Sequence, residues 1–210
     1  MYREPPWPGI RLNLRRALLL DVNLTNCSIA EADFTGAQFT GPADFDGAQF
    51  TGPAFFIDAR FTGPAFFTNA RFTGGAYFSD ARFTGPAFFA DARFTGPAFF
   101  SNARFTGPAF FSDAQFTDMA AFVRAEFTGP AFFTNARFTG PASFRDAQFT
   151  DMASFSNAEF TGRASFEGAH ASGPGQETVW PPGWTTRPAQ PDIGEDPAAR
   201  YLTWSEDPAG

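Results

Sequence analysis

Phenylalanine recurs along most of this chain at a fixed interval of eleven residues, and this period limits the possible folds more than any other feature. One series runs from Phe39 to Phe160 and a second from Phe34 to Phe166, so that the two alternate at steps of five and six residues. These series leave six of the 31 Phe, and each of the six directly precedes a series member. They are Phe55, Phe66, Phe88, Phe99, Phe110 and Phe132.

Each series Phe follows a small residue by two positions, and from Ala43 to Ala169 that residue is always Ala. The unit is therefore Ala-x-Phe-x-x, with one residue, most often Pro, inserted after every second unit. Units with Leu or Ile in place of Phe and without insertions precede these, beginning at Leu12. The sequence thus predicts three parts: an N-terminal lead (1–11), repeats (12–173), and a C-terminal cap and tail (174–210) rich in Pro, Trp and acid.

The eleven-residue period has two structural interpretations. It is typical of a right-handed helical supercoil, but the Thr-Gly-Pro that recurs in this chain excludes helices, because Pro removes a hydrogen bond and clashes with the preceding turn. A small residue and a Phe two positions apart instead lie on one face of a short extended segment. The Thr-Gly-Pro and Asp or Asn residues that follow favour turns. We therefore expect an all-β chain that winds around a core.

The unit resembles that of the pentapeptide-repeat proteins, and the resemblance covers about three quarters of the chain. It implies a right-handed quadrilateral parallel β-helix, a solenoid in which four units form the four sides of a coil. The inserted residue predicts mostly 22 residues per coil rather than 20, with Pro at the wider corners. About seven coils give a rod on the order of 35 Å long. The Phe-rich units and the VWPPGW segment resemble a bacterial subgroup of the family.

The residue before each inward Phe faces outward by the same alternation. Projected onto a 22-residue coil, these outward residues form aromatic columns on two opposite sides and Arg-containing columns on the other two. One aromatic column holds Phe66, Phe88, Phe110 and Phe132, and the opposite one holds Phe55, Tyr77 and Phe99. The Arg columns begin with Arg60, Arg82 and Arg104 and with Arg71 and Arg93.

Two interpretations of the aromatic columns remain open. Four contiguous rings exceed the few hundred Å² of apolar surface that monomers usually expose, which indicates an interface. Stacked rings between neighbouring coils also stabilise the rod itself, by ~0.2–1 kcal/mol per pair. For the Arg columns, acids two residues before several Arg favour a solvated, partly paired face over an anion-binding groove.

The inventory of reactive residues is small. Cys27 is the only Cys and occupies an inward position at the start of the rod, where we expect a buried and inert thiol. His170 is the only His and lies in the last unit. These counts exclude a disulfide framework and a metal site of His and Cys ligands, and there is no phosphate-binding loop. We expect no catalytic residue, metal or cofactor, and no enzyme activity.

A net charge of −7 disfavours nucleic-acid binding, and no apolar run is long enough to span a membrane. We therefore expect a soluble, cytoplasmic protein. In the C-terminal segment, Trp180 and Trp184 are predicted to cap the last coil, because an open solenoid end exposes an aromatic core. We expect order near 174–187 and a looser end beyond it, and the alternative is a disordered tail.

These features predict a non-enzymatic rod that binds an unknown protein or a second copy of itself. The alternative follows from the resemblance: some pentapeptide-repeat proteins mimic B-DNA, bind DNA gyrase and confer quinolone resistance. Residues 12–173 contain 15 Asp or Glu against 11 Arg, and the Arg columns interrupt a uniformly negative surface. The sequence therefore favours the first hypothesis.

Overall fold

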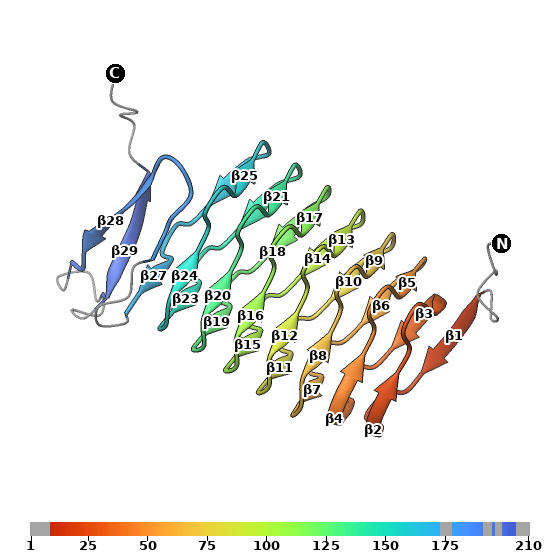
Figure 1. Cartoon of the computed structure of the whole chain (residues 1–210). Coiled ribbons are helices and arrows are strands. Elements are labelled where there is room, and N and C mark those ends of the chain that lie inside the picture. Colours follow the sequence, from red (N-terminus) through yellow and green to blue (C-terminus); the bar gives the residue numbers. More distant parts are fainter. Residues whose placement is uncertain (1–8, 173–177, 191–194, 196–198, 205–210) are drawn as a thin grey trace.

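The computed structural model describes residues 9–172, 178–190, 195 and 199–204. The chain forms a β-solenoid in which parallel coils lie side by side from β1 at one end to the β28–β29 hairpin at the other (Figure 1). The described residues contain no helix, and so none that is long and apolar enough to cross a membrane. Four longer strands form the first coils: β1 (Ile10–Asn13), β2 (Leu18–Asn23), β3 (Ser28–Asp33) and β4 (Gln38–Asp44).

From Gln49 onward each coil has four sides, and each side contributes a strand of two residues. Side 1 consists of β5 (Gln49–Phe50), β9 (Arg71–Phe72), β13 (Arg93–Phe94), β17 (Gln115–Phe116), β21 (Arg137–Phe138) and β25 (Glu159–Phe160). Side 2 consists of β6 (Ala54–Phe55), β10 (Ala76–Tyr77), β14 (Ala98–Phe99), β18 (Ala120–Ala121), β22 (Ala142–Ser143) and β26 (Ala164–Ser165).

Side 3 consists of β7 (Arg60–Phe61), β11 (Arg82–Phe83), β15 (Arg104–Phe105), β19 (Glu126–Phe127), β23 (Gln148–Phe149) and β27 (His170–Ala171). Side 4 consists of β8 (Ala65–Phe66), β12 (Ala87–Phe88), β16 (Ala109–Phe110), β20 (Ala131–Phe132) and β24 (Ala153–Ser154). The predicted quadrilateral all-β solenoid is confirmed.

The register of strand pairing gives the coil length. In the first coil Leu12 pairs with Ala32, which is 20 residues further along the chain. From Ala32, which pairs with Ala54, the step is 22 residues, and it stays so through the rod. The change coincides with the first inserted residues, as the sequence predicts.

The core consists of the inward Phe rings and the Ala side chains between them. Ala54 and Phe56 are fully buried, whereas Phe55 between them is half-buried, so the predicted alternation is confirmed. Along each column the rings stack in parallel: the centroids of Phe67 and Phe89 are 4.8 Å apart with their planes 1° apart. Rings of different columns meet edge to face, as Phe56 and Phe67 do at 5.5 Å and 89°. Both arrangements suit the quadrupole of an aromatic ring.

The inserted residue forms the wider corner. Its carbonyl accepts a hydrogen bond from the Ala N–H of the preceding coil, for example Ala65 N to Pro86 O at 2.9 Å. Where Met119 replaces Pro, its N–H donates to the carboxylate of Asp118 at 2.7 Å, and Asp118 stands where other corners have Gly. Met152 repeats this arrangement with Asp151. Pro therefore suits the corner because it has no N–H to satisfy.

The narrower corners contain a residue with left-handed backbone. This residue is mostly Asp or Asn, as at Asn102 (φ 56°) and Asp146 (φ 55°), and these residue types tolerate such a conformation. Arg124 occupies the same position between these two in the column, with φ 54°. Arg lacks the short polar side chain that lowers the cost of this conformation, so Arg124 is a locally unfavourable residue.

A cap covers the C-terminal end of the rod. Trp180 lies against Phe149 and Phe155, and Trp184 lies 4.8 Å from Phe166, so the predicted capping by both Trp is confirmed. Of the segment expected to be ordered, residues 174–177 lie outside the described residues. Strand β28 (Trp184–Pro188) pairs in an antiparallel manner with β29 (Arg200–Trp204).

The expectation of a looser end is wrong for 200–204. Strand β29 also pairs with β27 of the last coil, and the ring of Tyr201 lies 5.0 Å from that of His170. Arg187 donates hydrogen bonds to both carboxylate oxygens of Glu195, and these bonds hold the pKa of that carboxyl below its ordinary value. The end of the chain therefore extends the side 3 sheet beyond the last coil.

The N-terminal coil is less well covered. Leu12, Leu19 and Leu24 pack against the core but are only half-buried. Cys27 is half-buried as well, so the expectation of a buried thiol is wrong. The cause is its place near the end of the stack, where the five-residue units carry Leu or Ile instead of a larger ring.

Replacement of Arg124 tests the account of the narrow corners. We expect Arg124→Asn to raise the free energy of unfolding by roughly 1 kcal/mol, because Asn adopts the left-handed backbone more readily than Arg. Arg93→Asn, at an extended position of β13, removes the same charge and is the matched control. Chemical denaturation of both variants measures the difference, and an equal effect in the two would contradict this account.

Candidate interaction surface

The predicted aromatic columns are present on two opposite sides of the rod. On side 4, Phe66, Phe88, Phe110 and Phe132 stack with centroids 5.1, 5.0 and 5.2 Å apart and planes within 10°. We call this column the Phe66 ladder. On side 2, Phe55, Tyr77 and Phe99 stack at 4.9 and 5.3 Å, and we call this column the Phe55 ladder. The structure thus brings all seven predicted contact residues into two contiguous ladders.

The ladder rings are half-buried, because each ring covers the face of the next. The strongly exposed large apolar residues of the described part lie elsewhere, at Leu18, Leu20, Met119 and Val179. The ladders therefore present ring edges to solvent, and the apolar strip is narrower than four fully exposed rings would make it. Edge presentation leaves hydrogen atoms with partial positive charge pointing outward.

Each ladder ends at a smaller or charged residue. Asp44 pairs with Phe66 at one end of the Phe66 ladder, and Ser154 pairs with Phe132 at the other. The Phe55 ladder lies between Asp33 and Ala121. Although burial opposes its ionisation, hydrogen bonds from Thr35 and Arg15 hold the pKa of Asp33 below its ordinary value. The ladders are thus bounded patches in the middle of the rod.

The Arg columns lie on sides 1 and 3, between the ladders. Arg82 pairs in register with Arg60 and Arg104, so like charges follow one another along the rod. Each column ends in an acid of the next coil: Arg104 is 3.1 Å from Glu126 and Arg137 is 3.3 Å from Glu159. These pairs are exposed, and each contributes about 0–1 kcal/mol to stability.

The acids two residues before the Arg do not serve as their ion-pair partners. Within the described residues the ion pairs of the rod join neighbouring coils, as between Arg104 and Glu126, rather than Asp58 and Arg60. The cause is the narrow corner, which turns the chain between these two residues. A groove along side 3 contains Asp80, Arg82 and Asn102, so charges of both signs alternate along it. The solvated, partly paired face describes this surface better than an anion groove.

The two reactive residues lie far apart along the rod. Cys27 belongs to the first coils and His170 to the last one. The imidazole Nδ1 of His170 is 3.3 Å from the carbonyl oxygen of Gly168, and its ring packs on Tyr201 of the cap. Across the described part of the chain, no group of three His, Cys, Asp or Glu is placed to hold a metal ion. His170 therefore contributes to the cap, a role that sequence reasoning missed because it depends on β29.

Family models for pentapeptide repeats match both parts of the repeat region. One model matches residues 11–41, and a second matches overlapping segments that together extend from 45 to 170. Neither the curated proteins nor the solved structures contain a match to this chain.

The doubled Phe offers a direct test of the division between core and surface. We expect Phe111→Ala to lower the free energy of unfolding by about 3–5 kcal/mol, because its ring is fully buried between neighbouring coils. Phe110→Ala removes a ladder ring at the adjacent position and is expected to cost about 1 kcal/mol. Denaturation of both variants by guanidinium gives the comparison. Equal losses would mean that the ladder belongs to the core energetically.

Proposed function

The chain belongs to the pentapeptide-repeat family, and we propose that it serves as a non-enzymatic scaffold that binds a protein partner or a second copy of itself. The contact surface in this proposal is the Phe66 ladder, with the Phe55 ladder on the opposite side as a second surface. The cytoplasm is the proposed place of action. The single observation that carries the proposal is the run of four rings on side 4.

The Phe66 ladder has the properties of a preorganised contact surface. Its rings are stacked at 5.0–5.2 Å on a backbone that hydrogen-bonds from coil to coil. A partner that binds such a surface orders few side chains, which reduces the entropic cost of association. Aromatic side chains also supply large contact areas with only two rotatable bonds each. The ladder is therefore suited to binding without rearrangement.

The sides next to the ladder complete the arrangement. Sides 1 and 3 carry Arg71, Arg93, Arg82 and Arg104 beside acidic corners. An apolar strip between charged borders matches the common anatomy of protein interfaces, with an apolar centre and a polar rim. A second copy presents rings at the same interval of about 5 Å, so two Phe66 ladders match in period over their whole length. Self-association is thus the simplest form of the proposal.

Mimicry of DNA is the weaker alternative for this chain. A DNA mimic needs a continuous negative surface, because phosphates follow one another along both strands of the duplex. Arg60, Arg82 and Arg104 instead form a continuous positive column along side 3. Gyrase supercoiling in the presence of the protein tests this alternative, and we expect no inhibition.

The proposal is tested with a variant at the centre of the Phe66 ladder, Phe88→Ser with Phe110→Ser. Sedimentation over a range of concentrations measures self-association, and affinity capture from host lysate with quantified binding measures a protein partner. We expect the wild type to associate in one of these ways and the variant to lose at least roughly tenfold in affinity.

A control variant, Arg93→Ser with Arg137→Ser on side 1, is expected to bind as the wild type does. Circular dichroism confirms that both variants are folded. Equal binding by the ladder variant and the wild type, or no association by the wild type in either assay, would contradict the proposal.

A further inference from the structure

The four columns of inward rings end differently at the cap. Phe149, Phe155 and Phe166, the last rings of three columns, are fully buried beneath Trp180 and Trp184. Phe160, the last ring of the side 1 column, is only half-buried. It stacks on Phe138 on one side, and no described ring stacks on its other side.

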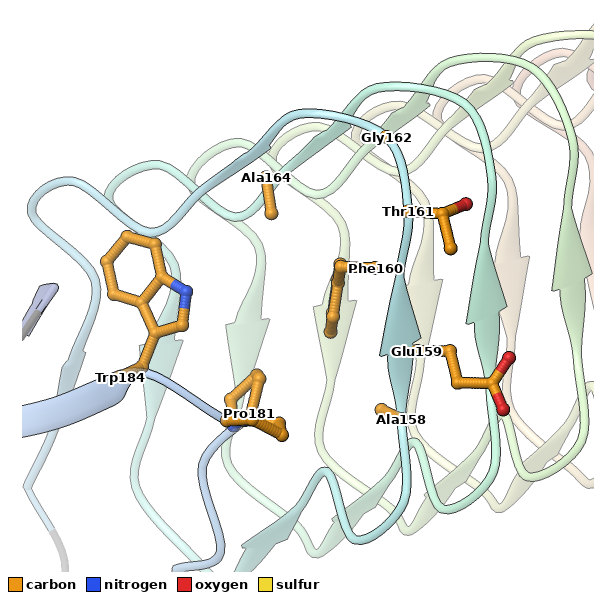
Figure 2. A pocket seen from close by; sticks show the side chains of 9 residues that line it. Ala158, Glu159, Phe160, Thr161, Gly162, Ala164, Pro181 and Trp184 are labelled. Atoms are coloured by element: carbon orange, nitrogen blue, oxygen red, sulfur yellow. The ribbon is translucent and has the colours of Figure 1, made fainter. Parts of the chain in front are cut away.

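Phe160 lines a cavity of about 640 Å³ between the last coil and the cap. Figure 2 shows its ring facing Trp184 and Pro181 across this cavity, whereas Glu159 and Thr161 project from the opposite side of the strand. Ala158, Ala164 and Pro182 complete the apolar part of the wall. The cavity thus has aromatic and Pro surfaces, and its volume lies in the range of small-molecule sites.

The geometry of the side 1 column defines what fits beside Phe160. Phe138 and Phe160 are 4.6 Å apart with planes within 3°, and Phe116 and Phe138 are 4.7 Å apart. The next residue in the repeat register, 22 positions after Phe160, is Pro182, which has no flat ring to continue the stack. The position beyond Phe160 therefore matches a planar ring in size and orientation.

We propose that this cavity binds an uncharged, planar aromatic small molecule of one or two fused rings, which continues the side 1 column by stacking on Phe160. The ligand is uncharged because the nearest carboxylate, that of Glu159, points away and pairs with Arg137 at 3.3 Å. The neighbouring segments 173–177, 191–194, 196–198 and 205–210 contain no Phe, Tyr or Trp that could supply the ring. This site lies at the end of the rod and is independent of the ladders.

The test uses 2-naphthol as the planar probe and decahydro-2-naphthol as its saturated, non-planar counterpart. Isothermal titration of the full chain is expected to show one site that prefers 2-naphthol by roughly tenfold, because only the flat ring stacks. Phe160→Leu keeps an apolar side chain and removes the stack, so it is expected to abolish most of this preference. Phe132→Leu, a ring outside the cavity, is the matched control.

Two further variants make the result decisive. Ala164→Leu fills the cavity without altering the side 1 column, and it is expected to abolish binding even if Phe160→Leu lowers the melting temperature. Trp204→Ala shows whether the chain's own indole occupies the cavity: binding by this variant but not by the wild type would overturn the proposal. Equal affinity for the two probes, or no binding by either protein, would overturn it as well.

Discussion

The structure depends on the agreement between two distances. Parallel strands of neighbouring coils lie about 4.8 Å apart, and aromatic rings stack at nearly the same separation, as Phe67 and Phe89 do at 4.8 Å. Phe can therefore repeat in every coil without a gap or a clash, while Ala brings the backbone close enough to close the coil. Leu has no flat face to stack, and the Leu-based first coil is correspondingly the part whose apolar residues stay half-buried.

The same agreement of distances explains the surface. Any residue that faces outward meets its equivalent in the next coil, so Phe66 and Phe88 stack and Arg82 and Arg104 fall in line. The rod thus converts a repeated residue into a column. Where a column ends, the repeat leaves an edge: Glu126 compensates the charge of Arg104, and the cavity at the cap lies beyond Phe160. The proposed contacts of the protein follow from columns and from their ends.

Features set by the repeat could be predicted from the sequence. The inward position of Phe56, the outward position of Phe55 and the corner role of Pro86 follow from local alternation and a fixed period, so no long-range information is needed. Strand β29 could not be predicted, because its pairing with β28 and His170 joins segments outside the repeat pattern. The ion pairs between coils and the half-buried state of Cys27 depend likewise on which residues meet in space.

The central claim is that ring stacking makes the middle of the rod one rigid unit that holds the ladders in place. Amide hydrogen exchange followed by mass spectrometry tests it most directly, because inter-coil hydrogen bonds such as Thr84 N to Phe61 O protect the amides of every side. The account predicts slow and nearly uniform exchange over residues 43–160 on all four sides, with faster exchange towards residue 9. Fast exchange confined to the ladder sides 2 and 4 would contradict it.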